Sequence, residues 1–367
     1  MSSQPVLDFE KLLAPVDGPN PSGTNLRGGA GREVYDQIRG ARNQARVREK
    51  PQMMGDPNAA PGVPEEWSIV WDKCVEAIAQ KSKDLELATY LIEALVRFQG
   101  FAGLRDGFRL YRELADRYWD TAYPSDEGDG PAGRVATMGG LNGDATRDGA
   151  LRFPLFRVPL TDEKSGSLSA FQYEYALSIE QLPSERKQQR IDSGHVSLQT
   201  FEAAARATNS PFAAQLNADI NECAQEFDKL AVLLEAKCGA DAPTSSKIRE
   251  MLQKSRTIVE SLYKDRLVMN APPTQPETGP GGTTSLPPEP TGPISSREQA
   301  FKTIEEIAQF FRRTEPHSPL IYALEQVVRW GKLPLPELLS ELIQDDGARS
   351  RLFELIGIRP KDNSDGS

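Results

Sequence analysis

The sequence is poor in the residues from which most enzyme and metal sites are built. Its 367 residues include three cysteines and two histidines, so a disulfide scaffold is excluded and a zinc site would need mostly carboxylate ligands. Cys74, Cys223 and Cys238 are far apart in the chain and form no C-x-x-C pair, which favours a reducing compartment. We therefore predict neither a cofactor nor a metal site.

An excess of basic charge and long apolar runs are missing as well. The chain has 43 Lys and Arg against 53 Asp and Glu, a formal net charge of −10, which disfavours nucleic acid and anionic membranes as partners. No segment approaches the roughly 18 apolar residues of a membrane span. The first residues, MSSQPVLDFE, lack the apolar core of a secretory signal. We expect a cytoplasmic protein without membrane insertion.

Motifs that signal catalysis are also lacking: the chain has no H-E-x-x-H, G-x-S-x-G or Walker A pattern. His195 lies between Ser193 and Ser197, which leaves a Ser/His hydrolase as an alternative, although residues this close in sequence rarely form a nucleophile–base pair. His317 lies in a proline-flanked turn. We predict that the protein is not an enzyme and has no catalytic residues.

One basic stretch stands out against the acidic background. Residues 32–50 hold six Lys and Arg residues against three acidic ones and have a helical pattern. The glycine-rich run Gly28-Gly29-Ala30-Gly31 precedes them, and glycines before a helix can cradle phosphate. This spacing fits neither the Walker nor the dinucleotide motif. We favour a solvated basic helix and keep a nucleotide-binding adaptor as the alternative.

Apolar periodicity predicts helices in most of the chain and no strands, hence an all-α class. Trp67, Val70, Cys74 and Ile78 mark one helix, Asp84 can cap the next, and Gly100 closes it before a third helix up to Trp119. Residues 124–168 lose this periodicity, and the prolines in 153–160 predict an extended segment there. Ser169–Gln181 predicts one more helix.

The second half of the chain predicts a hairpin, a tether and a small domain. Between residues 211 and 268, two heptad-like seams are separated by a Gly/Pro turn, as in an antiparallel helical hairpin. Residues 270–293 contain eight prolines and four glycines, a composition typical of a flexible linker. The predicted domains are 1–198 (irregular at 1–64 and 124–168), 199–269, a linker at 270–294, 295–358 and a tail at 359–367.

The domain at 295–358 is small and rich in apolar side chains. Four helices are expected there, the last one around Leu352–Ile356. Their apolar faces extend beyond what a core of this size needs, which argues for self-association; the alternative is that these side chains close a monomeric core. The residues predicted to take part are Ile307, Phe310, Glu315, Pro316, His317 and Trp330.

Three stretches resemble the TssA family, the ImpA-related components of the bacterial type VI secretion system. The first runs from Leu12-Leu13-Ala14-Pro15 to Asn25-Leu26-Arg27, and the second from Ser82-Lys83-Asp84-Leu85-Glu86 to Tyr118-Trp119-Asp120. The third extends from Ser296-Arg297-Glu298 to Arg329-Trp330-Gly331. Together they cover about half of the chain. The run Gly28–Gly31 departs from the acidic turn that many relatives have at this place.

The resemblance implies a non-enzymatic assembly protein of the short form. It implies a homo-oligomeric ring of C-terminal domains and contacts with baseplate, tail tube, sheath or membrane-complex subunits. Long members of the family act at the distal end of the growing sheath, whereas some short ones are tied to the baseplate. The length of this chain favours a role in bridging the baseplate to the tail tube and sheath; a cap at the distal sheath end is the alternative.

Overall fold

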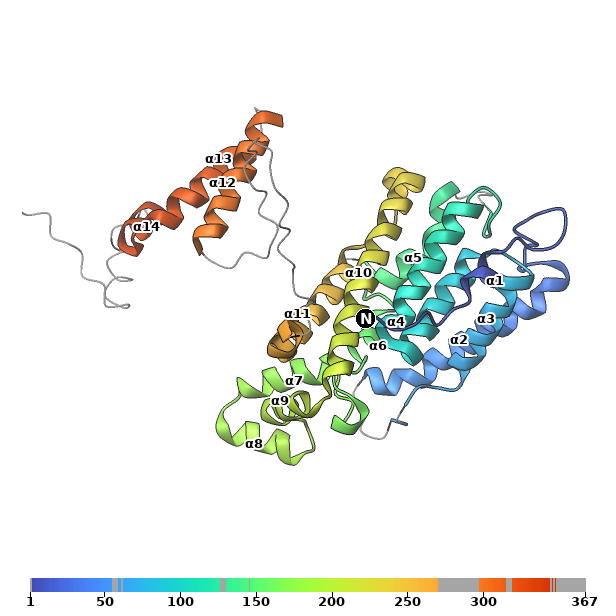
Figure 1. Ribbon diagram of the computed structural model, residues 1–367, viewed down its shortest axis with the longest axis horizontal. Helices are drawn as coiled ribbons and strands as arrows, with labels where there is room; N and C mark the ends of the chain where they lie inside the picture. Colours follow the sequence, from blue (N-terminus) through green and yellow to red (C-terminus); the bar gives the residue numbers. More distant parts are fainter. Residues whose placement is uncertain are drawn as a thin grey trace, which may run out of the picture. The chain divides into compact units, whose positions relative to one another are not determined.

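The computed structural model describes residues 2–54, 59–60, 62–125, 130–144, 146–269, 297–314, 319–343, 345 and 347. The chain divides into two compact units, Met1–Gln275 and Pro276–Ser367, which are described separately. Within the described ranges the secondary structure is helical, with isolated bridges and no strand (Figure 1). The prediction of an all-α protein is confirmed. Of the described helices, none has both the length and the apolar character that crossing a membrane demands.

The helices of the first unit are joined by short loops and three 3-10 turns. They are α1 (Phe9–Leu13), α2 (Arg32–Met53), α3 (Glu66–Gln80), α4 (Leu85–Tyr118), α5 (Gly130–Asn142), α6 (Arg152–Phe156), α7 (Ala170–Glu180), α8 (Ser184–Asp192), α9 (Leu198–Ala207), α10 (Ser210–Cys238) and α11 (Ser246–Met269). The 3-10 turns are η1 (Gly29–Gly31), η2 (Glu163–Ser165) and η3 (Gly239–Asp241).

The long helix α4 is the centre of the first unit, because α3, α5 and α10 all pack against it. Its N-cap is Asp84, whose carboxylate accepts from the backbone N–H of Glu86 (2.9 Å) and Leu87 (3.2 Å). Gly100 interrupts the helix with φ of 53° and ψ of −132°, a conformation that glycine adopts without steric cost. The cap and the break both match the sequence prediction.

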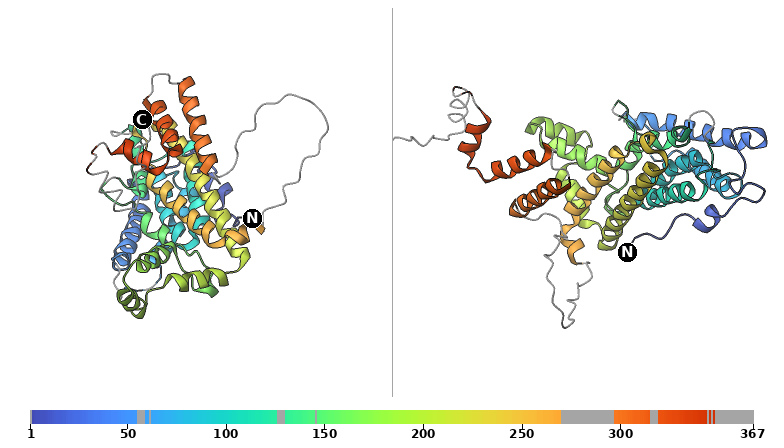
Figure 2. Two further views of the ribbon diagram at one scale, coloured as in Figure 1. Left: turned by 90° about the vertical axis from the view of Figure 1, so that its left-hand side faces the viewer. Right: turned by 90° about the horizontal axis from the view of Figure 1, so that it is seen from above.

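The predicted hairpin is formed by α10 and α11. The seam of α10 is buried, and it consists of Leu216, Ile220, Cys223, Phe227, Leu230 and Leu234. This helix packs along α4 as well as along α11, and Phe108 and Phe227 lie with their ring centroids 4.9 Å apart. The segments on the two sides of residue 198 therefore share one core. Figures 1 and 2 show the short helices α7, α8 and α9 gathered at one end of this unit.

Two expectations for the middle of the first unit are wrong. The stretch 124–168, expected to be irregular, contains α5 and α6, and the segment 153–160, expected to be extended, begins inside α6. Pro154 lies in the first turn of α6, where backbone N–H groups have no partner within the helix. A proline is therefore tolerated at this position, whereas in a helix interior it would break a hydrogen bond.

The second unit contains α12 (Arg297–Thr314), α13 (Pro319–Lys332) and α14 (Leu335–Leu342). The helices α12 and α13 pack closely because Gly331 has no side chain: a Cβ there would overlap the ring of Phe301. Arg297 strengthens this contact by donating from Nη2 to the carbonyl of Gly331 (2.8 Å). The predicted linker 270–294, the fourth helix around 352–356 and the tail 359–367 lie outside the described residues.

Candidate functional site

We call residues 12–27, 82–120 and 296–331 the signature stretches. The first two meet in space, although about 60 residues separate their contacting segments in sequence. The backbone N–H of Lys83 donates to the carbonyl of Ser22 (2.8 Å), and that of Thr24 donates to the carbonyl of Lys81 (3.0 Å). Gly23 lies between these bonds with φ of +73°, and a Cβ at this position would overlap the Lys81 carbonyl. The glycine is therefore required by the close approach of two backbone segments.

A cluster of charged and phenolic groups fixes this contact. Arg27 donates from Nη1 to Asp84 (2.7 Å) and from Nη2 to Glu86. Glu86 also accepts from the hydroxyl of Tyr35 (3.0 Å) and from that of Tyr90. Burial and the hydrogen bond to Glu86 raise the pKa of Tyr90 well above its ordinary value. The guanidinium thus ties the loop after α1 to the first turn of α4 through groups that are mostly withdrawn from solvent.

Lys83 is a second charged group that the signature places in the interior. Its side chain is fully buried, and its Nζ donates to the carbonyls of Leu12 (2.9 Å) and Ile78 (2.7 Å). Desolvation lowers the pKa of Lys83 to about 8. The ammonium group connects the C-terminal ends of α1 and α3, where helix dipoles favour a cation.

A third buried set joins α2 to α4. Glu49 of α2 accepts from the indole Nε1 of Trp67 (3.0 Å) and from Nε of Arg97 (2.7 Å). Arg42, which lies two turns before Glu49 on α2, donates to Glu93 of α4 (2.6 Å). These polar groups therefore have internal partners, and their arrangement indicates a role in holding helices in register rather than in binding a ligand.

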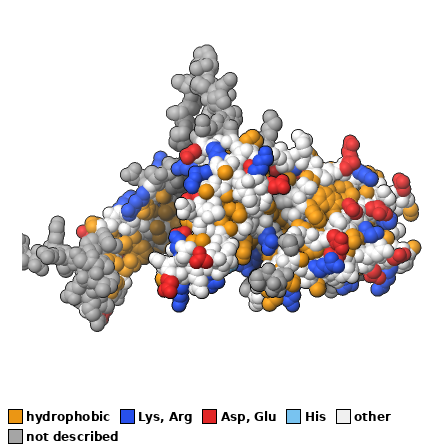
Figure 3. All heavy atoms as spheres, turned by 90° about the horizontal axis from the view of Figure 1, so that it is seen from below, with side chains coloured by type: hydrophobic (Ala, Val, Ile, Leu, Met, Phe, Trp, Pro, Cys, Tyr) orange, Lys and Arg blue, Asp and Glu red, His pale blue; other side chains and the backbone are white. Residues whose placement is uncertain are grey.

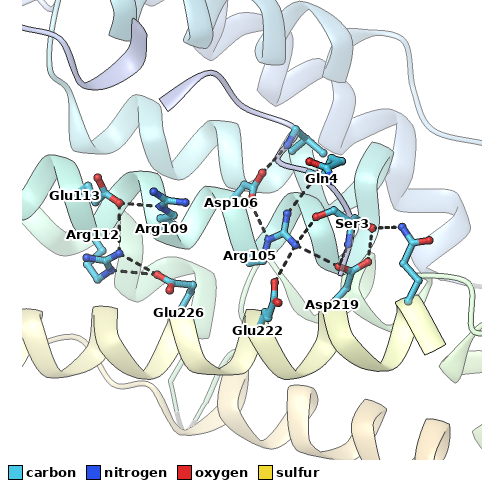
Figure 4. Close-up of polar contacts among 12 residues, drawn as sticks. Ser3, Gln4, Arg105, Asp106, Arg109, Arg112, Glu113, Asp219, Glu222 and Glu226 are labelled. Carbon is cyan, nitrogen blue, oxygen red and sulfur yellow. Dashed lines mark hydrogen bonds and ion pairs between the residues drawn. The ribbon is translucent and has the colours of Figure 1, made fainter. Parts of the chain in front are cut away.

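A ladder of ion pairs connects α4 to α10 and to the N-terminal arm (Figure 4). Arg105, which is buried, donates from Nη1 to Asp219 (3.3 Å) and to the carbonyl of Ser3 (3.0 Å). The backbone N–H of Ser3 in turn donates to Asp219 (2.7 Å). Two turns further along α4, Arg112 donates to Glu226 (3.1 Å). The arm before α1 is thereby fastened to the main helices of the unit.

The residues considered for a hydrolase do not converge on one another. The hydroxyl of Ser193 donates to a carbonyl of α8 (2.7 Å), and that of Ser197 accepts from a backbone N–H in the first turn of α9 (3.0 Å). The ring of His195 packs against that of Tyr175, with centroids 4.7 Å apart. This geometry gives the hydrolase alternative no support. His317 lies outside the described residues.

The glycine-rich run before α2 forms a short turn that packs on the loop of the signature. Residues Gly29–Gly31 are the 3-10 turn η1, and a Cβ on Gly31 would overlap the side chain of Leu26. This close packing explains the glycine nearest to α2 without invoking a phosphate. Within the described part of the chain, no group of three or more His, Cys, Asp or Glu side chains could hold a metal ion.

The residues predicted for self-association lie on different parts of the second unit. Ile307 and Phe310 share one face of α12, and their exposed fractions are 42% and 53%. Trp330 of α13 is half-buried and lines a groove together with Phe301 and Val327. The structure therefore does not join Trp330 to the exposed pair of α12 in one groove. Glu315, Pro316 and His317 lie outside the described residues.

Further apolar side chains of the second unit are exposed, although the sequence pattern does not single them out. Tyr322, Val327 and Leu342 have exposed fractions of 69%, 41% and 51%. Each belongs to a helix with a strong apolar stripe, so the pattern alone assigns it to the core. On the face drawn in Figure 3, hydrophobic side chains of the C-terminal helices are open to view.

Comparison with known proteins agrees with the signature. Residues 13–143 match the family model described as ImpA, N-terminal, type VI secretion system. The chain is 26% identical over 348 residues to the type VI secretion system component TssA1 of Pseudomonas aeruginosa, covering 93% of this chain and 96% of that protein. It is also similar to a solved N-terminal domain, including the conserved ImpA_N region, of the TssA component from Burkholderia cenocepacia. That similarity has a TM-score of 0.57 and 25% identity, and covers 72% of this chain and 97% of the solved chain.

Proposed function

Because the chain belongs to the TssA family of type VI secretion system components, we propose that it is a non-enzymatic structural component that assembles through its C-terminal unit. In this proposal the C-terminal helices form a ring in the cytoplasm. The first unit of each copy then bridges the baseplate to the tail tube and sheath. A ring holds many copies of a weak binding surface together, and this raises their effective concentration for a partner.

The observation that supports assembly is the small core of the second unit. Among its described hydrophobic side chains, three are buried: Ala308, Ile321 and Val328. Five large ones are exposed there: Ile307, Phe310, Tyr322, Val327 and Leu342. Three helices with so little buried apolar surface are marginal alone, and association with further copies would cover the exposed side chains.

Light scattering coupled to size-exclusion chromatography of the full-length protein tests this assembly. We expect an oligomer for the natural protein and a monomer when Ile307→Asp and Phe310→Asp are combined. The matched control combines Phe171→Asp and Leu177→Asp, which replace two exposed apolar side chains of α7, and should leave the oligomer unchanged. A natural protein that is monomeric at micromolar concentration would contradict the proposal.

The role in bridging the baseplate to the tail needs a separate test in cells. A fluorescent fusion of the protein, imaged together with a labelled sheath, should stay at the base while the sheath extends. Movement of the fusion with the far end of the growing sheath would instead support the distal cap. The variant that combines Ile307→Asp and Phe310→Asp links the two experiments. If the ring is needed for function, this variant should lose both its oligomeric state and sheath formation in cells.

A further inference from the structure

The outward face of α2 has a row of cations that form no ion pair with a carboxylate of the described residues. We call the α2 basic stripe the side chains of Arg39, Arg46 and Lys50, which are exposed. They lie seven and four residues apart, so they project from one side of the helix. The buried side of the helix includes Ile38 and Ala45, which directly precede Arg39 and Arg46 and therefore lie about 100° around the helix axis from the stripe. In Figures 1 and 2, α2 runs along the outer edge of the first unit.

Several other exposed arginines on helices of this unit pair with a carboxylate four residues away, whereas Arg186 and Arg190 of α8 stand four residues from each other. Examples of the pairs are Arg117 with Glu113, Arg152 with Asp148 and Arg256 with Glu260. Such pairs stabilise a helix modestly and lower the net field around it.

No described carboxylate pairs with the stripe in this way, because Asp36, three residues before Arg39, pairs with Arg32 instead. Four residues before and after Arg46 stand Arg42 and Lys50, and like charges at this spacing destabilise a helix. Arg42 turns inward and pairs with Glu93. Arg39 and Arg46 lie too far from the C-terminal end of α2 for its dipole to account for them, whereas Lys50 lies in the last turn. Local helix stability therefore does not explain the stripe.

We propose that the α2 basic stripe is a docking surface for an acidic, amphipathic segment of a partner protein. Charge complementarity selects such a partner, because the stripe concentrates positive charge on a chain whose net charge is −10. Apolar contact is available beside the stripe: Val47, which follows Arg46, and Met54, the C-cap of α2, have exposed fractions of 69% and 77%. Carboxylates three and four residues apart on a partner helix would meet the cations while one apolar side chain covers Val47.

The dimensions of the stripe favour a protein segment over a polyanion. From Arg39 to Lys50 the helix rises about 16 Å, at 1.5 Å for each residue. Duplex DNA carries about one negative charge in each 1.7 Å of its axis. Over the length of the stripe, three cations would therefore neutralise a small part of the phosphate charge. The remaining acidic chain would repel the rest. An acidic membrane surface presents the same mismatch.

The inference goes beyond the proposed assembly, since it concerns the first unit and requires no ring. The test measures binding of the full-length protein to synthetic helical peptides by fluorescence anisotropy. One peptide has glutamates three and four residues apart and one leucine between them; its counterpart has lysines in place of the glutamates. A single-stranded oligothymidylate and vesicles with phosphatidylglycerol are the competing probes. Light scattering of the same samples reports assembly independently.

We expect the natural protein to bind the acidic peptide in a salt-dependent manner. Combining Arg39→Glu, Arg46→Glu and Lys50→Glu should weaken this binding at least about tenfold and create affinity for the lysine peptide. The matched control reverses three exposed cations elsewhere on the first unit, through Arg186→Glu, Arg190→Glu and Lys264→Glu. It should change the affinity less than about twofold.

Three results would overturn the proposal. The first is equal loss of binding in the control variant, which would indicate a general charge effect. The second is failure of the lysine peptide to bind the reversed stripe. The third is tighter binding of the oligothymidylate or the vesicles than of the acidic peptide, which would assign the stripe to another class of ligand. Circular dichroism should show unchanged helicity for both variants, because the replaced side chains are exposed.

Discussion

The buried ammonium group of Lys83 makes the stability of the first unit depend on pH in a defined direction. Its pKa is lowered by desolvation from 10.5 to about 8. The folded chain therefore releases this proton at a lower pH than the unfolded chain does. Between pH 8 and 10.5 the unfolded state binds more protons, so the free energy of unfolding rises with pH in this window.

The perturbation that isolates this effect is Lys83→Met, which keeps a chain of similar length and removes the titration. A shift of 2.5 pKa units corresponds to about 3 kcal/mol between the protonated and neutral forms. We compare the free energy of unfolding of the natural protein with that of the variant. Integrating the titrations of the folded and unfolded states predicts that this difference changes by about 2 kcal/mol from pH 7 to pH 9.5. The difference in unfolding free energy, natural minus variant, should increase by this amount.

Urea unfolding followed by tryptophan fluorescence measures this difference. Both proteins carry Trp330→Phe, so that Trp67, Trp71 and Trp119 report on the first unit alone. The slope with pH is the informative quantity, because the loss of the donor to two carbonyls shifts the variant by a constant amount. Tyrosine ionisation above pH 10 affects both proteins alike and lies outside the window. A difference that stays flat from pH 7 to 9.5 would refute the reasoning, since the ammonium would then be as well solvated as in the unfolded chain.

Two further predictions concern residues of the signature stretches. Gly331→Ala should separate α12 from α13 through overlap with Phe301, lowering both the stability of the second unit and its self-association in light scattering. By contrast, Gly40→Ala on α2 meets open space and should stabilise its unit by up to about 1 kcal/mol; equal effects of the two changes would contradict the packing argument. Arg27→Met should cost roughly 3 kcal/mol in urea unfolding, because it leaves the buried Asp84 without its cation, and a loss below about 1 kcal/mol would show that the pair is well solvated.

The long helices could be predicted because apolar side chains at helical spacing form the face that each helix buries. The seam of α10 repeats at steps of three and four residues, and each of its members is buried. The break at Gly100 was equally visible, since glycine in a helical pattern permits a conformation that other residues resist. Asp84 could likewise be predicted as an N-cap, because aspartate is favoured at the position directly before a helix. In these cases the determining interaction is close in sequence to the residue that reveals it.

Of the short helices, α7 was predicted correctly as Ser169–Gln181, but α6 and α8 could not be found in this way. Helix α8 buries none of its residues, so it has no apolar period for a pattern to detect. In α6 the first-turn proline suggested an extended segment, because the rule that disfavours proline in helices depends on its position in the turn. Helix α6 is stabilised by the burial of Pro154 and Leu155 against its neighbours, whereas α8 depends on the helix propensity of its own polar residues.

Some of the charged residues in the site lie in stretches that the sequence singles out, but their ion-pair partners could not be predicted. Arg27 and Asp84 lie 57 positions apart, and Arg105 and Asp219 lie 114 apart. A pairing over such distances leaves no periodic trace in either segment. The exposed side chains of Tyr322 and Leu342 were missed for the opposite reason, because a strong apolar stripe is assigned to the core although a small unit cannot cover all of it.

The polar groups of the first unit are either paired with one another in the interior or exposed, and this difference bears on where a partner could bind. Most of its signature charges are committed to one another, and buried pairs of this kind specify helix register while adding little net stability. A rigid unit with internally satisfied charges is suited to transmit position within an assembly, but those charges cannot recognise a partner. Recognition would then fall to exposed groups, such as the α2 basic stripe on the first unit and the exposed apolar side chains of α12 to α14. Each surface is small, so its affinity for one partner is expected to be low, and assembly into many copies is what would make such contacts effective.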